Sequence, residues 1–281
     1  MFEKSLIKST IKILIVVIVL GVVLSNTGQF SEIKNISQDY YEYFFKDYEK
    51  SLVELERQYG ISIEYIVDSK FIDEQGQLPP TNGKATQLDD FSIARYAKIL
   101  PQVLSQYPPE VFKTHIETIK LSKILSFYST RYGGSTVDKI IYLTDDGRDN
   151  GFSDFFIRQT FHHEFSSVLM KSRDFPTQKW LDANSPEVKY ETNFENFLKS
   201  ISKDRDLVGN DYFYQRGMMS KYSYSTLEND FNLFAQTVFN EPERMKDLIR
   251  QYLIIKRKYE ILKEFYLSIS PEFSTTFKLI D

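Results

Sequence analysis

The chain has 281 residues, of which 42% are hydrophobic and 26% charged, a balance that excludes collagen-like, mucin-like and fully disordered proteins. It has no cysteine, which excludes a disulfide scaffold, a cysteine-ligated zinc site, an iron–sulfur cluster and a cysteine nucleophile. The formal net charge is −4, and no arginine-rich stripe is present. We therefore expect no binding to nucleic acid, which requires a basic surface.

The first 29 residues are predicted to form a signal anchor or a signal peptide. Lys4, Lys8 and Lys12 precede an unbroken apolar run over residues 13–24. The run is shorter than the ~20 residues that span a bilayer, but lysine side chains that reach the headgroups allow about residues 6–25 to cross. We favour an uncleaved single-pass anchor, with cleavage as the alternative. With an anchor or with a cleaved signal peptide, the lysines are expected to remain on the cytoplasmic side of the membrane. The rest of the chain, called the body here, is then exported to the cell surface or periplasm.

Residues 30–281 are predicted to form one extracytoplasmic α+β domain, mostly helical with a small sheet. Apolar residues at helical spacing predict a helix over residues 38–58, which Gly60 ends. Alternating β-branched residues predict a strand over residues 61–67. Glycine and proline predict a loop over residues 73–88.

The remaining elements are also mostly helices. Asp89 or Asp90 is expected to cap a helix that runs to about Tyr107, and Pro108-Pro109 to open another that runs to about Tyr128. A turn at residues 131–135 and a strand over residues 139–143 follow. Further helices are predicted over residues 153–171, 190–202, 225–239 and 244–268.

The candidate chemistry lies in the helix over residues 153–171. One side of it is an apolar stripe made of Ile157, Phe161, Phe165 and Val168. His163 and Ser167 share nearly the opposite side. His163 and Glu164 form the first half of an H-E-x-x-H motif, in which two imidazoles four residues apart bind zinc and the glutamate takes a proton from the metal-bound water.

The second half of this motif is missing. Ser167 stands four residues after His163, and Ser166 stands four residues after His162. A neutral hydroxyl is a poor zinc ligand, and a zinc site normally has at least three strong protein donors. On spacing alone, a packed or hydrogen-bonded histidine pair is therefore favoured over a metal site.

The order of motifs over about residues 89–270 resembles the zinc-binding metallopeptidases of bacterial cell surfaces, a gluzincin-like group. These proteins share an HHEF helix, here residues 162–165, and a later G-x-x-S-x-Y-A…E-D-F segment, here GMMSKYSYSTLENDF at residues 217–231. The resemblance implies a zincin-like fold, peptide-bond hydrolysis and a zinc cofactor.

The resemblance also implies roles for individual residues. His163 would be the first metal ligand, Glu164 the general base and Glu228 the third ligand. An alignment on Phe231 gives the third position to Asn229 instead, and Ser167 stands where the second histidine should be.

Several of these residues also have simpler structural roles. Ser225 and Glu228 have the spacing of a capping box, which needs no metal. His115 lies off the apolar stripe of its helix and is expected to be exposed. The tyrosines near residues 212–224 either line a cleft or pack at the surface, and we favour surface packing.

Two functional hypotheses follow. The first is a membrane-anchored metallopeptidase-like protein, in which the strand over residues 139–143 is a sheet edge that pairs with an extended peptide. Glu164 would then activate a water on a metal held by His163, Glu228 and a further donor. The second is a metal-free pseudo-peptidase that binds a peptide or a protein partner without cleaving it. Ser167 distinguishes the two hypotheses. Because it stands at the position of the second histidine, a peptidase would need another metal ligand from elsewhere, whereas a binding protein would not.

Overall fold

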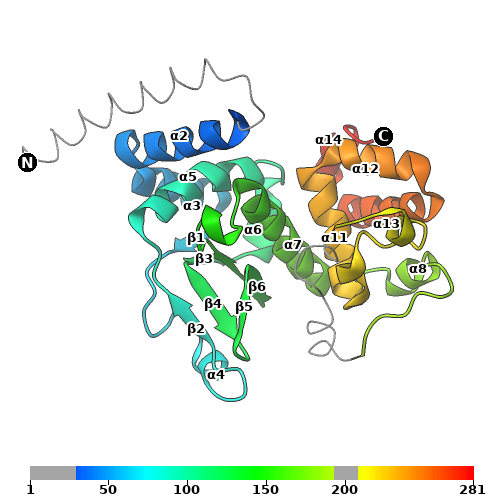
Figure 1. Ribbon diagram of the computed structural model, residues 1–281, viewed down its shortest axis with the longest axis horizontal. Coiled ribbons are helices and arrows are strands. Elements are labelled where there is room, and N and C mark those ends of the chain that lie inside the picture. Colours follow the sequence, from blue (N-terminus) through cyan, green and yellow to red (C-terminus); the bar gives the residue numbers. More distant parts are fainter. Residues whose placement is uncertain (1–29, 193–207) are drawn as a thin grey trace, which may run out of the picture.

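The computed structural model describes residues 30–192 and 208–281, which form a mostly helical α+β fold with two small sheets (Figure 1). Helix α7 (Asp154–Ser172) lies between the sheets and the C-terminal helices (Figure 1). The prediction of a mostly helical α+β fold is confirmed. The predicted membrane segment lies outside the described residues. In the part that is described, no helix has the length and apolar character needed to cross a bilayer.

The predicted helix over residues 38–58 is two helices, α2 (Phe30–Phe45) and α3 (Tyr48–Tyr59). The chain breaks between them because the Asp47 side chain caps α3, accepting a hydrogen bond from the backbone N–H of Lys50. Gly60 ends α3 in the left-handed conformation, as predicted. Asp89 caps the next long helix, α5 (Asp90–Leu104), also as predicted.

A four-stranded sheet positions α7. Its strands, in spatial order, are β1 (Ser62–Glu64), β3 (Thr118–Ser122), β7 (Ile140–Thr144) and β6 (Gly134–Val137). β1, β3 and β7 are parallel, and β6 is antiparallel to β7. The predicted strands at residues 61–67 and 139–143 correspond to β1 and β7. However, β7 lies between β3 and β6, so the predicted edge role of residues 139–143 is wrong and the sheet edge on that side is β6.

The second sheet is three-stranded, with the order β2 (Lys84–Thr86), β4 (Ile124–Phe127) and β5 (Thr130–Tyr132). The predicted helix to Tyr128 is wrong, because α6 (Pro109–His115) is short and β3 and β4 follow it. Ile119 and Leu121 are two residues apart, so their buried apolar side chains share one face of the strand. The predicted turn at residues 131–135 is likewise wrong, since β5 and β6 meet there.

Helix α7 packs antiparallel on α11 (Leu227–Asn240), as the ion pair of Lys171 with Glu228 and the hydrogen bond from Arg158 to Asn240 show. The predicted apolar stripe of α7 is buried. The other side of α7 meets polar groups of α11. Ser166 Oγ donates to Asn232 Oδ1 (2.6 Å), and Asn232 Nδ2 donates to Ser167 Oγ (2.6 Å).

The predicted helix over residues 244–268 is also two helices, α12 (Pro242–Gln251) and α13 (Leu253–Ile269). Tyr252 between them is extended, and its hydroxyl donates to Asp211 Oδ1 (2.5 Å).

Most of the predicted helix over residues 190–202 lies outside the described residues. The remaining short elements are α4 (Glu74–Gln77), α8 (Thr177–Asp182), α10 (Asp211–Tyr214), α14 (Ser274–Phe277) and the 3-10 turns η1 (Arg148–Asn150), η2 (Lys221–Tyr224) and η3 (Pro271–Phe273). Of these, α4 lies with β2 in the segment 73–88 that was predicted to be a loop.

Candidate functional site

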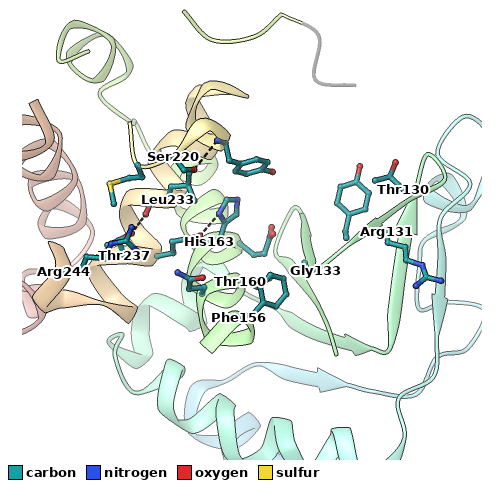
Figure 2. A pocket seen from close by; sticks show the side chains of 17 residues that line it. Thr130, Arg131, Gly133, Phe156, Thr160, His163, Ser220, Leu233, Thr237 and Arg244 are labelled. Carbon is teal, nitrogen blue, oxygen red and sulfur yellow. Dashed lines mark hydrogen bonds between the residues drawn. The ribbon is translucent and has the colours of Figure 1, made fainter. Parts of the chain in front are cut away.

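A cleft of about 640 Å³ opens between the β5–β6 strands and α11, with α7 as its floor (Figure 2). Residues 130–134 form one wall. The floor carries Phe156, Thr160, His163 and Glu164, and the opposite wall is built from residues 219–222 and α11. The cleft thus contains two of the three residues predicted for the site, His163 and Glu164.

Within residues 30–192 and 208–281, β6 pairs only with β7, so its other edge is free there, and Gly134 of this edge lines the cleft. In an antiparallel ladder, alternate residues direct their backbone N–H and C=O groups to the neighbouring strand. The Gly133 carbonyl accepts a hydrogen bond from the N–H of Thr144 on β7, so the odd-numbered residues of this strand face β7. The backbone groups of Gly134 and Thr136 therefore face away from the sheet.

Gly134 allows the strand to approach α7 closely. A Cβ atom at this position would lie 2.5 Å from Thr160 Cγ2 and 2.9 Å from Glu164 Cγ. Both atoms belong to a packed helix, so a side chain at residue 134 would push β6 away from α7. The glycine thus sets the distance between the free strand edge and the floor of the cleft.

Both ring nitrogens of His163 face amide side chains of α11. Nδ1 is 3.1 Å from Gln236 Oε1, and Nε2 is 3.2 Å from Asn229 Oδ1. Burial lowers the pKa of His163, which favours a neutral ring with one donor and one acceptor nitrogen. Asn229 donates its NH₂ to Ser225 Oγ (2.9 Å), which leaves Oδ1 to accept from His163 Nε2. We infer that Gln236 turns its own NH₂ towards Nδ1.

Glu164 lies in the floor of the cleft, where burial and the nearby Glu228 carboxylate raise its pKa to about 8. Tyr222 lies on the opposite wall, and burial together with the charge of Glu164 raises the pKa of its hydroxyl. The expectation that the tyrosines of this segment pack only at the surface is therefore wrong for Tyr222, although Tyr212 is exposed.

Glu228 is not among the cleft residues, and its carboxylate pairs with Lys171 Nζ (2.8 Å). The cap of α11 is Thr226, which accepts from the N–H of Asn229 (3.0 Å), so the predicted cap at Ser225 is wrong. Adjacent helical residues point about 100° apart, and it is Asn229 rather than Glu228 that lies against the ring of His163.

The side chains near His163 do not fit a zinc ion. Ser167 is only 2% exposed and is hydrogen-bonded to Asn232 of α11. The partners of the His163 ring are the amides of Asn229 and Gln236, which are weaker zinc donors than carboxylates. Within residues 30–192 and 208–281, no three His, Asp or Glu side chains are grouped so that they could hold a metal ion.

The other two histidines lie outside the cleft. His162 is fully buried, its Nδ1 lies 2.7 Å from the Tyr107 hydroxyl, and burial lowers its pKa to about 3. It is a neutral core residue. His115 was predicted to be exposed, which is wrong. It is only 4% exposed, because its helix is short and packs on the end of α7, where Ser172 Oγ lies 2.9 Å from His115 Nδ1.

Sequence reasoning missed Gly134 and Gln236. Asn229 and Gln236 are seven residues apart, which is two helical turns, so a pair of amides on one face of α11 could have been read from the sequence. Nothing in the sequence placed that face opposite His163. The role of Gly134 depends on a contact between β6 and α7 that only the fold reveals.

No protein-family model matches the chain, and no curated protein does. Among solved structures, the chain is similar to a Bacteroides caccae protein described as a "putative zinc-binding metallo-peptidase". The two share 16% sequence identity with a TM-score of 0.48, over 86% of this chain and 88% of the other.

The raised pKa of Glu164 predicts a pH-dependent stability. Between the ordinary value of 4.5 and about 8, the folded state keeps a proton that the unfolded state releases. The free energy of unfolding should therefore fall as pH rises through this range, by at most about 1.4 kcal/mol per pH unit. Glu164→Gln should remove this fall, as measured by urea denaturation at several pH values. Glu243→Gln, at an exposed residue of α12, is the control. An unchanged pH profile in Glu164→Gln would contradict the assignment.

Proposed function

We propose that the protein binds an extended peptide in the cleft, as an additional strand on the free edge of β6. The observation that carries this proposal is the outward direction of the Gly134 and Thr136 backbone groups on β6, the strand whose residue Gly134 lines the cleft of about 640 Å³. Strand addition draws affinity from main-chain hydrogen bonds, and pockets for alternate side chains provide specificity.

The other cleft residues support a peptide as the ligand. Tyr132, Phe156 and Tyr222 offer aromatic surface to apolar side chains. Arg131 and Arg244 carry positive charge, and Arg244 is held in place by Glu241 Oε2 (2.9 Å) and the Tyr214 hydroxyl (3.0 Å). Preorganised side chains lose little conformational freedom when a ligand binds.

The proposed activity is binding without metal-dependent hydrolysis, which makes the protein a pseudo-peptidase. A metallopeptidase needs three strong donors and an open position for water. Here position 167 is a serine bonded to Asn232, and the ring of His163 is held by two amides. A peptidase with Glu164 as general base would require ligands beyond those in the described residues.

We also propose that residues 1–29 anchor the chain in a membrane, with the body outside the cytoplasm. The apolar run over residues 13–24, preceded by Lys4, Lys8 and Lys12, supports this location. Protease added to intact spheroplasts should digest the body. Complete protection of the body until the membrane is permeabilised would contradict the proposed orientation.

The free edge of β6 can be tested with proline. A proline at residue 136 removes an N–H that β7 does not use, so the sheet should tolerate it. The probe is a peptide selected from a phage-displayed library on the full-length chain. Thr136→Pro should weaken its binding about tenfold, or 1.4 kcal/mol, measured by fluorescence anisotropy.

The matched control is Thr136→Val, which keeps the backbone N–H and replaces only the side-chain hydroxyl with a methyl group. It should bind the peptide as the wild type does. Equal affinity of the proline variant and the wild type, with both folded by circular dichroism, would refute strand addition. A selection that yields no binding peptide would also count against the proposal.

A further inference from the structure

The helix α2 has an exposed apolar face. Ile36, Tyr40, Tyr41 and Phe45 are 41%, 43%, 46% and 39% exposed, respectively. At about 100° per residue, Tyr40, Tyr41 and Phe45 fall within the half-turn that starts at Ile36. Asp39, which is buried, points to the opposite side of the helix. The outer face of α2, defined by these four residues, is therefore aromatic and in contact with solvent.

Buried charges hold α2 on the body. Asp39 is 1% exposed and forms ion pairs with Lys98 of α5 and with Arg148 (2.5 Å). Arg148 and Lys98 also bind Asp154, the first residue of α7, at 2.6 and 2.7 Å. Removing one partner from such a buried set leaves an uncompensated charge, so the arrangement resists separation. The outer face of α2 thus has a fixed direction relative to the body.

The sequence indicates what covers this face. Only five residues, 25–29, separate the apolar run over residues 13–24 from the start of α2 at Phe30. A helix that follows a membrane segment so closely lies near the headgroups, where tyrosine side chains are enriched. Between residues 30 and 46 the chain has three acidic residues and two lysines, a net charge of −1. This charge gives no preference for anionic lipids.

We propose that the outer face of α2 lies on the surface of a lipid bilayer, with its aromatic rings among the headgroups. This inference rests on the proposed membrane anchor and is independent of peptide binding. Because α2 is fixed to α5 and α7, its contact with the bilayer also orients the body. The β2–β4–β5 sheet lies on the side of the molecule opposite α2 and therefore faces away from the membrane (Figure 1).

Quenching of tryptophan fluorescence by brominated lipid tests this contact. The full-length chain is reconstituted into phosphatidylcholine vesicles with bromine near the headgroup end of the acyl chains. Tyr41→Trp places a fluorophore on the outer face of α2. Tyr128→Trp is the matched control, because Tyr128 is 60% exposed in the turn between β4 and β5. The native Trp180 is buried and gives a common background.

We expect most of the fluorescence added by Tyr41→Trp to be quenched and that added by Tyr128→Trp to remain. Replacing part of the phosphatidylcholine with phosphatidylglycerol should not change the result. Vesicle flotation without quenching of Tyr41→Trp would overturn the inference while leaving the anchor in place. A chain that does not float with vesicles would overturn both. If Tyr41→Ser converts a dimer into a monomer, the face binds a second copy and the inference fails.

Discussion

The antiparallel contact between α7 and α11 is the interaction on which the cleft depends. Asn232 of α11 is fully buried and bonds to both Ser166 and Ser167 of α7. A buried polar group that loses its partner costs about 1–3 kcal/mol, so these bonds favour one register of the two helices. That register places Asn229 and Gln236 on either side of the His163 ring. It also sets α11 opposite the edge of β6, which gives the cleft its second wall.

The same contact determines the chemistry of the floor. In an H-E-x-x-H helix, the residue four positions after the first histidine points to the metal. Here that residue is Ser167, and its hydroxyl is used to join two helices. The side-chain amide of Asn229 is hydrogen-bonded to Nε2 of His163, an atom that would otherwise be available to coordinate a metal. The floor is therefore built for hydrogen bonding, and the edge of β6 beside it is the proposed site for a peptide backbone.

Local sequence signals predicted the elements whose determinants are local. The apolar stripe of α7, the cap at Asp89 and the end of α3 at Gly60 are confirmed because each depends on a few neighbouring residues. The segment after His115 was predicted incorrectly as helix, since Ile119 and Leu121 owe their strand conformation to pairing with β1 and β7.

The site was harder to predict because its geometry depends on contacts between distant segments. The helical period places His163 nearly opposite the apolar stripe of α7, but the partners of its ring are 66 and 73 residues away in sequence. Asp230 illustrates the same limit. It lies in the acidic first turn of α11, but its burial and its ion pair with Lys258 of α13 (2.5 Å) depend on a helix 28 residues away in sequence.

The zinc content of the purified full-length chain, measured by elemental analysis after dialysis against zinc, tests the central claim most directly. The account predicts far less than one zinc per wild-type chain. The double variant Ser167→His/Asn229→Glu, which supplies an imidazole and a carboxylate beside His163, should bind zinc. The additional change His163→Ala should abolish that binding. One zinc per chain in the wild type would contradict the account, because it would require a ligand set other than the hydrogen-bonded floor.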